Sequence, residues 1–366
     1  MKRIPELDGL RAFAAAVILA FHLSPQSLPA GWTGVDLFFV ISGYLITSIL
    51  ISRPLTGRVL FSFYVRRALR IWPIYYLGLA FVVLVNPWIP WPYSLVALPY
   101  YLTYTQNVWF YWGAKPVPFN PAFDHTWTLA LEEQYYLVWP LFLAVVSRRF
   151  LPVLCLATAG VAYLGRSGFV LDFPYPLVMK ELPDCVLLSR CDGFALGGLL
   201  AWILGTSAIP RRYAGGLLWA ALGGASLYLG TGLSQEGLRF FGVPKPAKPG
   251  PTILMVEVFY LGVVGLVVLH SGKPVLAWLR QGWLCWLGMI SYGIYLYHYL
   301  IYWIVDGCAW NYDRAYQQSW SVGFWKVVIT LAVATISWYA IERPLLGLKD
   351  RFPYESSKGA SPESGP

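Results

Sequence analysis

Two ionisable residues, Arg11 and His22, lie in the first apolar stretch of the chain, GLRAFAAAVILAFHL. Ionisable side chains inside a membrane are energetically costly, so such a pair indicates a function rather than a purely structural helix. Their spacing corresponds to about three turns of α-helix, which places both side chains on one face, about 16 Å apart along the axis. This separation is too long for a hydrogen bond. We therefore expect the two residues to hold two parts of an extended ligand, or one residue to react while the other positions the ligand.

The composition is that of an integral membrane protein. Hydrophobic residues make up 57% of the chain and charged residues 12%, and the mean hydropathy is +0.55. Soluble domains usually contain about 25% charged residues. The net charge of +9 is explained by the excess of Lys and Arg that cytoplasmic loops carry, so it does not indicate a nucleic-acid partner. We predict a multi-pass protein of the cell inner (cytoplasmic) membrane, surrounded by membrane lipid.

The cysteines give no indication of a metal site, and the N-terminal segment gives none of a cleavable signal peptide. No C-x-x-C pair and no neighbouring histidine set with metal-ligand spacing is present, so we predict no metal. The apolar run after the basic start MKR ends at His22 without a small-residue cleavage site, so this segment is expected to remain as the first helix. The cysteines are Cys155, Cys185, Cys191, Cys285 and Cys308.

Apolar stretches of sufficient length predict an all-α fold, a polytopic integral membrane helical bundle of about ten transmembrane helices. These stretches lie at residues 10–24, 33–52, 68–86, 128–146, 151–165, 187–205, 213–233, 252–270, 283–305 and 322–341. Residues 94–112 are excluded because their Tyr, Trp, Thr, Gln and Asn content is typical of an interfacial segment. We expect a polar tunnel lined by the first, third, fourth and sixth spans.

The positions of the basic residues predict the topology. When the N-terminus is placed inside, most Lys and Arg residues fall on inside segments, as the positive-inside rule requires. Both termini are then cytoplasmic. The transmembrane domain is expected to cover residues 1–347. Residues 348–366 are expected to form a cytoplasmic tail, which we predict to be disordered because its end is polar and poor in apolar residues.

Several sequence segments, in this order, resemble one known family. They are LDGLRAFAAAVILAFH (7–22), GVDLFFVISGYLIT (34–47), FYVRRALRIWPIYY (63–76), HTWTLALEEQYYLVWP (125–140), SRCDGFALGGLLA (189–201), SYGIYLYHYLI (291–301) and IERPLL (341–346). Together they resemble the membrane-bound acyltransferase-3 family of bacterial O-acyltransferases, whose R-x10-H signature is matched by Arg11 and His22. The resemblance spans nearly the whole chain.

The resemblance implies an enzyme that transfers an acyl group, usually acetyl, from cytoplasmic acyl-CoA to a hydroxyl group. Acetyl-CoA or another acyl-CoA would be the donor. The acceptor would be a carbohydrate or a secondary metabolite, since family members modify O-antigens, exopolysaccharides, Nod factors, peptidoglycan and macrolides. The sequence does not select among these acceptors.

His22 is the residue best suited to start this chemistry. A neutral imidazole is a good general base near pH 7 and can deprotonate a sugar hydroxyl. Direct attack of that hydroxyl on the thioester and a covalent acyl-histidine intermediate both stay open. The structural alternative is a buried histidine that is hydrogen-bonded to a neighbouring carbonyl.

The arginines of the first and third spans are candidates for donor binding. Arg11 would hold part of the CoA while the pantetheine arm runs along the helix toward His22; alternatively, its guanidinium reaches lipid phosphates. Arg66, Arg67 and Arg70 open the third span, and Arg66 and Arg70 lie four residues apart on one helical face. Clustered guanidinium groups suit the phosphates of CoA. The alternative is that these residues are topology signals only.

Glu132 matches the glutamate of the family's W-[ST]-L-x-x-E-x-x-[FY]-Y motif. We expect it to orient His22 or to bind the acceptor hydroxyl, and the structural alternative is an ion pair with Arg190. Its neighbour Glu133 would point about 100° away, so at most one of the two carboxylates can face a given site.

Other polar residues of these segments are candidates for the acceptor pocket. Tyr295 and His298 lie on one helical face. Asp192 is expected to pair with Arg190, because an unpaired buried charge is costly, and Asp36 would cap the second span. The complete set of pocket candidates is His125, Arg190, Asp192, Tyr295, His298 and Asp36.

A transporter or flippase of an acyl group or glycolipid is the competing interpretation, based on the number of spans and their buried charges. Many transporters consist of two related halves with broken helices near the middle of the membrane. The sequence shows no such duplication, and we favour the enzyme.

Overall fold

The computed structural model describes residues 3–86, 95–108, 121–166, 186–205, 211–231, 249–308 and 319–354. These ranges contain helices and no β-strand, which confirms the all-α class for the described part of the chain. The α-helices are α1 (Pro5–Leu23), α2 (Gly34–Ile51), α3 (Gly57–Val85), α4 (Leu98–Leu102), α6 (Pro121–Asp124), α7 (Trp127–Val145), α8 (Leu151–Arg166), α9 (Leu187–Arg190), α10 (Asp192–Gly205), α11 (Arg211–Thr231), α13 (Pro249–Leu269), α14 (Gly282–Met289), α15 (Ser291–Cys308), α17 (Trp320–Ser337) and α18 (Arg343–Gly347). Shorter 3-10 segments are η1 (Pro29–Thr33), η3 (Leu95–Ala97), η4 (Arg148–Phe150), η6 (Pro274–Arg280) and η8 (Leu348–Arg351), and η7 (Trp338–Glu342) is a π-helical turn.

Several of these helices are long and apolar enough to cross a membrane. Within the described residues they number four, Pro29–Ile51, Gly57–Val85, Pro251–Leu269 and Trp320–Arg351. A fifth candidate is the pair α14 and α15, which is bent by 65°. Each of the ten predicted spans overlaps a helix, but the number of crossings and the cytoplasmic location of both termini stay predictions.

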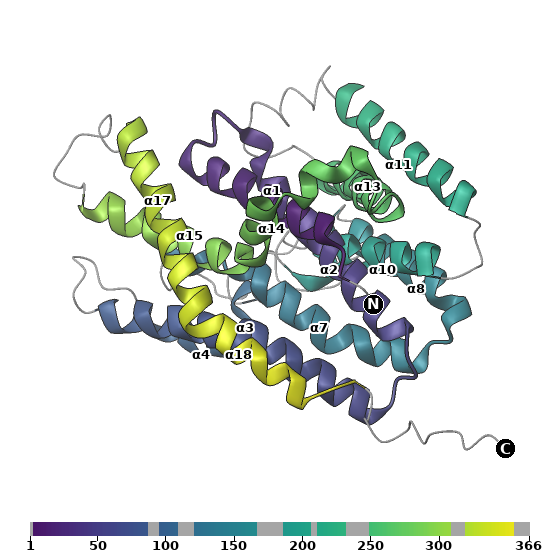
Figure 1. Ribbon diagram of the computed structural model, residues 1–366, viewed down its shortest axis with the longest axis horizontal. Coiled ribbons are helices and arrows are strands. Elements are labelled where there is room, and N and C mark those ends of the chain that lie inside the picture. Colours follow the sequence, from purple (N-terminus) through teal and green to yellow (C-terminus); the bar gives the residue numbers. More distant parts are fainter. Residues whose placement is uncertain are drawn as a thin grey trace, which may run out of the picture.

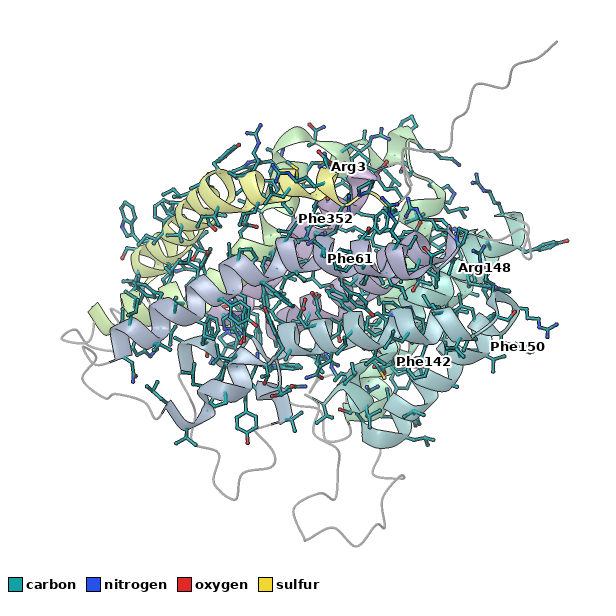
Figure 2. The ribbon with its side chains drawn as sticks, turned by 90° about the horizontal axis from the view of Figure 1, so that it is seen from below. Arg3, Phe61, Phe142, Arg148, Phe150 and Phe352 are labelled. Carbon is teal, nitrogen blue, oxygen red and sulfur yellow. The ribbon has the colours of Figure 1, made fainter. Side chains whose placement is uncertain are left out.

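The helices pack around α2, which runs through the middle of the bundle beside α1 and α10 (Figure 1). α11 and α13 form a pair at one side; at the other, α17 packs on α15, and η7 and α18 continue from it onto α3. Many outward side chains are large and apolar. Phe61, Phe142 and Phe150, labelled in Figure 2, are about half exposed. Such extensive exposed apolar surface is what a lipid environment requires.

The contact between α2 and α10 depends on glycine at two positions. A Cβ atom on Gly43 would lie 2.0 Å from the carbonyl oxygen of Phe194, and one on Gly197 would lie 2.2 Å from that of Val40. Small residues of this kind let two helix backbones approach closely in a membrane. This close approach brings the polar beginnings of α2 and α10 together.

The predicted C-terminal tail begins at residue 348, but residues 348–354 pack on α3. The Ser62 hydroxyl donates a hydrogen bond to the Pro353 carbonyl oxygen (3.1 Å), and the rings of Phe61 and Phe352 are 6.2 Å apart. The packing has a simple cause, because the segment RFPY supplies apolar and aromatic groups that can be buried against α3. The rest of the predicted tail lies outside the described residues.

Candidate active site

A cavity between α1, α2, α3, α7 and α15 contains most of the charged residues expected to act on a donor. The space free of protein atoms among its lining residues, including the part open to solvent, is about 640 Å³. We call it the arginine cavity. Its polar lining consists of Arg11, Ser42, Arg67, Arg70, Thr128, Glu132, Tyr136, Ser291, Tyr292 and Tyr295. α2 and α15 therefore form walls that the sequence did not predict. α10, expected as a wall, contributes no residue to this lining and packs on α2 instead.

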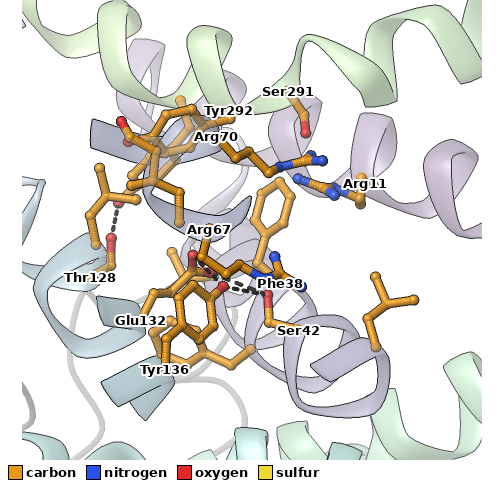
Figure 3. A pocket seen from close by; sticks show the side chains of 16 residues that line it. Arg11, Phe38, Ser42, Arg67, Arg70, Thr128, Glu132, Tyr136, Ser291 and Tyr292 are labelled. Carbon is orange, nitrogen blue, oxygen red and sulfur yellow. Dashed lines mark hydrogen bonds between the residues drawn. The ribbon is translucent and has the colours of Figure 1, made fainter. Parts of the chain in front are cut away.

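Positive charge dominates the arginine cavity. Arg11, Arg67 and Arg70 point into the same space (Figure 3), and none of them takes part in an ion pair with another described residue. The guanidinium of Arg67 lies 5.2 Å from the ring of Tyr136, and that of Arg11 lies 5.9 Å from the ring of Phe38. Partly buried guanidinium groups without carboxylate partners are well suited to bind an anion.

Glu132 is the carboxylate of this cavity. It accepts hydrogen bonds from the Tyr136 hydroxyl (2.9 Å) and the Ser42 hydroxyl (3.4 Å). Glu133 turns away and accepts from the indole nitrogen of Trp72 (2.9 Å), as helical geometry requires of adjacent residues. The structure does not bring Glu132 to His22, and it gives Arg190 a different partner.

Sequence reasoning missed the hydroxyl groups that surround Glu132. Thr128 and Tyr136 lie one turn before and one turn after it on α7 and line the same cavity. Their spacing of four residues on either side of Glu132 was a readable signal, because such residues share a helix face. Ser42 gave no comparable signal, since its place beside Glu132 depends on how α2 and α7 pack.

A second cavity lies beside the start of α1, and we call it the entrance cavity. Its lining includes Arg3, Asp8, Arg53, Arg66 and Tyr354. It shares Arg11, Leu45 and Arg70 with the arginine cavity. The two cavities therefore adjoin at these three side chains, between the beginning of α1 and the interior of the bundle.

Arg66 has the most protein contacts of the predicted donor-binding arginines. Its Nη1 atom donates to the carbonyl oxygens of Lys349 (2.9 Å) and Phe352 (3.3 Å). The ring of Tyr354 lies between two guanidinium groups, 5.0 Å from Arg66 and 4.4 Å from Arg53. The i, i+4 pair Arg66 and Arg70 does share one cavity, whereas Arg67 faces the other.

Three of the four histidines of the chain form a cluster. The ring centroids of His22 and His298 are 4.9 Å apart, and those of His125 and His298 are 5.1 Å apart. His22 is half-buried, whereas His125 and His298 are buried. The described residues contain no group of three or more His, Cys, Asp or Glu side chains arranged to hold a metal ion, and the absence of a metal stays a prediction.

Tyr295 separates this cluster from the arginine cavity. Its side chain lines the cavity, and its ring centroid lies 5.3 Å from that of His125 and 5.6 Å from that of His298. Its hydroxyl donates to the His125 carbonyl oxygen (3.0 Å) and is 2.6 Å from the Thr128 hydroxyl oxygen. His22 therefore lies beyond Tyr295 and does not line the cavity.

Arg11 and His22 both face helix α15. Arg11 shares its cavity with Ser291, Tyr292 and Tyr295 at the start of α15, and His22 contacts His298 further along. The common face expected from the spacing is thus the face that packs on α15. The two residues mark the ends of a route that passes Tyr295.

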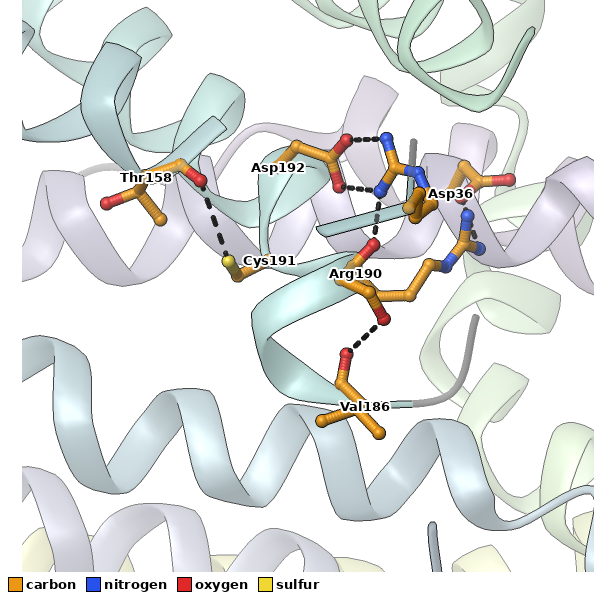
Figure 4. A network of polar contacts seen from close by, with 8 residues as sticks. Asp36, Thr158, Val186, Arg190, Cys191 and Asp192 are labelled. Atoms are coloured by element: carbon orange, nitrogen blue, oxygen red, sulfur yellow. Dashed lines mark hydrogen bonds and ion pairs between the residues drawn. The ribbon is translucent and has the colours of Figure 1, made fainter. Parts of the chain in front are cut away.

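The remaining pocket candidates form a buried ionic network of their own (Figure 4). Arg190 pairs with Asp36 (2.6 Å), and Asp192 pairs with Arg166, whose Nη1 donates to Oδ1 at 3.0 Å. Asp192 was expected to pair with Arg190. Residues two positions apart do not face each other on helical backbone, and the carboxylate of Asp36 on α2 binds Arg190 instead. Asp36 is fully buried in this ion pair rather than serving as a simple helix cap.

Sequence reasoning also missed two residues near this network. Arg166, the residue after the predicted span 151–165, is buried at the end of α8. Glu257 on α13 is fully buried, and its carboxylate oxygen lies 3.0 Å from the Cβ position of Gly193, the residue after Asp192. A single acidic residue within ILMVEVFYLG was a visible signal, because isolated charges are rare in apolar helices.

The chain belongs to the Acyl_transf_3 family, an acyltransferase domain whose model matches residues 4–339. Similar proteins include the O-acetyltransferase OatA of Staphylococcus aureus (strain NCTC 8325 / PS 47), which is 29% identical over 354 residues, covering 93% of this chain and 57% of the relative. The peptidoglycan O-acetyltransferase OatA of Listeria monocytogenes serovar 1/2a is 27% identical over 400 residues, covering 94% of this chain and 56% of the relative. The chain therefore spans little more than half the length of these relatives. No solved structure matches the chain significantly.

Proposed function

We propose that this chain is a multi-pass membrane O-acyltransferase that moves an acetyl group from cytoplasmic acetyl-CoA to a hydroxyl group of a carbohydrate. Its membership of an acyltransferase family supports the reaction class. The relatives named as O-acetyltransferases, one of them acting on peptidoglycan, support acetyl as the group and a glycan as the acceptor. The observation that carries the donor assignment is the set of three arginines without ion-pair partners among the described residues, which line one cavity together and two of which, Arg11 and Arg70, also line the adjoining cavity.

The two adjoining cavities suggest how an acyl-CoA would bind. The nucleotide part carries several phosphates, and Arg11 and Arg70, which line both cavities, supply guanidinium groups that match phosphate geometry. The nucleotide would occupy the entrance cavity and the pantetheine arm the arginine cavity. The thioester would then approach Tyr295, and side-chain movement at Tyr295 would admit it to the histidine cluster.

His22 would act as the general base. It removes the proton from the acceptor hydroxyl, the hydroxyl oxygen attacks the thioester carbonyl, and the carbon–sulfur bond breaks. The departing thiolate of CoA takes up a proton, so that free CoA and an O-acetyl ester are the products. In the covalent variant His22 itself attacks the thioester, and the acceptor then attacks the acyl-imidazole.

The test of this function is the His22→Ala variant, assayed in detergent with radiolabelled acetyl-CoA and soluble peptidoglycan fragments. General-base catalysis usually contributes about 10² to 10⁴-fold, so transfer should fall by at least that factor while acetyl-CoA binding and protein abundance are kept. The matched control is His270→Ala, which removes a histidine that lies on the short turn after α13, outside the cluster.

A rapid-quench experiment decides between the two routes, and the activity of the His22→Ala variant can reject both. Label that remains on the protein after rapid quench without acceptor, and is lost in His22→Ala, supports the acyl-histidine. Absence of such label supports direct attack. A His22→Ala protein that transfers acetyl groups at nearly the wild-type rate would refute the assignment of His22.

A further inference from the structure

Hydrogen bonds link His22 directly to one carbonyl group and, through a second histidine, to another. His22 Nδ1 lies 3.1 Å from the Ile18 carbonyl oxygen and 3.1 Å from Nε2 of His298. His298 Nδ1 lies 2.6 Å from the Tyr295 carbonyl oxygen, and His125 Nε2 lies 3.0 Å from the same oxygen. The side chain of His298 is fully buried.

These contacts determine which ring nitrogens carry hydrogen. A carbonyl oxygen can only accept, so His298 Nδ1 and His125 Nε2 must both be protonated. In the neutral ring of His298, Nε2 is then an acceptor. His22 Nδ1 faces this acceptor and the Ile18 carbonyl oxygen, so it must also carry its hydrogen. The unprotonated nitrogen of neutral His22 is therefore Nε2, which makes no hydrogen bond to any described residue.

We propose that His298 is the positioning residue for His22, an inference that rests on the proposed role of His22 as a base. The Tyr295 carbonyl fixes the ring of His298, and His298 in turn holds His22 with Nε2 free to accept a proton. When Nε2 is protonated, the Nδ1–H bond to His298 becomes charge-assisted and stronger. His298 thus stabilises the imidazolium that forms in the transition state, and it contacts neither donor nor acceptor.

This arrangement uses a neutral partner where many enzymes use a carboxylate to orient the catalytic histidine. No carboxylate among the described residues contacts His22, and Glu132 lies on the other side of Tyr295, in the arginine cavity. A neutral imidazole avoids burying another charge in the membrane. His125 supports the arrangement from the other side, since its Nε2 donates to the same Tyr295 carbonyl oxygen.

Nitrogen-15 NMR of the wild-type protein in lipid bilayers tests the geometry without any activity measurement. Protonated and bare ring nitrogens have well-separated shifts, and each of the four histidines can be assigned by removing it. Above the ordinary histidine pKa of about 6.5, His22 and His298 should be protonated at Nδ1 and His125 at Nε2. His270, which donates Nδ1–H to the Leu266 carbonyl oxygen (2.9 Å), is an internal reference. A bare Nδ1 on His22 overturns the proposal.

A matched pair of substitutions then tests the role. In His298→Gln the amide reaches the position of Nε2 and can accept from His22, whereas in His298→Asn it reaches only the position of Nδ1. Loss of a hydrogen bond to a charged group corresponds to about a ten- to hundredfold effect. We expect His298→Asn to lower kcat by that factor with the KM for acetyl-CoA unchanged, and His298→Gln to restore most of the rate.

The double variant separates positioning from general structural damage. In a His22→Ala background there is no base to position, so adding His298→Asn should leave the residual rate unchanged. A further tenfold loss in that background would show that His298 acts independently of His22 and would overturn the proposal. Equal loss in His298→Gln and His298→Asn, at wild-type abundance, would do the same.

Discussion

The protein holds arginines inside the bundle in two regions, fully buried in one and partly buried in the other, and the two regions differ in how the charge is compensated. In the ionic network, Arg166 and Arg190 each hold a carboxylate, Asp192 and Asp36 respectively. The arginine cavity is lined by three guanidinium groups and a single carboxylate, that of Glu132. No described residue forms an ion pair with any of the three arginines. The same side chain is thus used in two ways within one bundle.

The difference indicates which arginines serve the fold and which serve a ligand. A buried ion pair holds two helices in register. Removing one partner leaves the other charge buried and uncompensated, which lowers the free energy of unfolding strongly. In the cavity the like charges already repel each other, so removing one relieves strain within the protein. A bound anion, in contrast, would be stabilised by all three guanidinium groups. Substitutions should therefore change protein stability in the ionic network and ligand affinity in the arginine cavity.

The largest expected effect is in the ionic network. Asp192→Asn would leave Arg166 buried without its charged partner, and breaking such a pair costs about 3–5 kcal/mol. We expect the free energy of unfolding in detergent to fall by that amount and membrane abundance to fall with it. Asp8→Asn is the matched control, because its ion pair with Arg3 is exposed and is worth about 0–1 kcal/mol. Equal stability of the two variants would contradict the structural role of the network.

The next effect is on donor binding in the arginine cavity. Arg70→Ala should retain the stability of the wild type but lose a charge-assisted contact worth about 1.5–3 kcal/mol, or roughly a ten- to hundredfold loss of affinity. Adenosine 3′,5′-bisphosphate, competing with labelled acetyl-CoA, measures this loss without any chemistry. Arg149→Ala removes the same charge from an exposed position and should bind like the wild type. Unchanged affinity in Arg70→Ala would remove the ligand explanation of the cavity.

The helices could be predicted from the sequence because apolar length alone determines them. Each predicted span overlaps a helix, and the common face of Arg11 and His22 follows from the helical repeat, which is a local property. The partners of buried charges could not be predicted in this way. Asp36 and Arg190 are 154 residues apart, and they meet because Gly43 and Gly197 allow α2 and α10 to approach closely.

The histidine cluster shows the same limit. His22, His125 and His298 were each identified as candidates by residue type, yet nothing in the sequence placed their rings in contact. Their hydrogen bonds converge on the Tyr295 carbonyl oxygen, a backbone atom that no residue-type pattern reveals. The tertiary packing of α1, α15 and the turn between α6 and α7 supplied that information.

The smallest expected effect concerns Arg66. Its neighbour in sequence, Arg67, lines the arginine cavity, but Arg66 itself makes the contacts of a structural arginine. Its Nη1 donates to the carbonyl oxygens of Lys349 and Phe352, so two of its five N–H donors are already used and the guanidinium is held against the C-terminal segment. We expect Arg66→Ala to lower stability by about 0.5–1.5 kcal/mol, the net value of an ordinary hydrogen bond, and to change the affinity for adenosine 3′,5′-bisphosphate far less than Arg70→Ala does. The same competition assay and unfolding measurement compare the two variants directly. If Arg66→Ala weakens binding as much as Arg70→Ala, then satisfied hydrogen bonds do not distinguish structural from ligand-binding arginines here, and the donor site extends to the C-terminal segment around Tyr354.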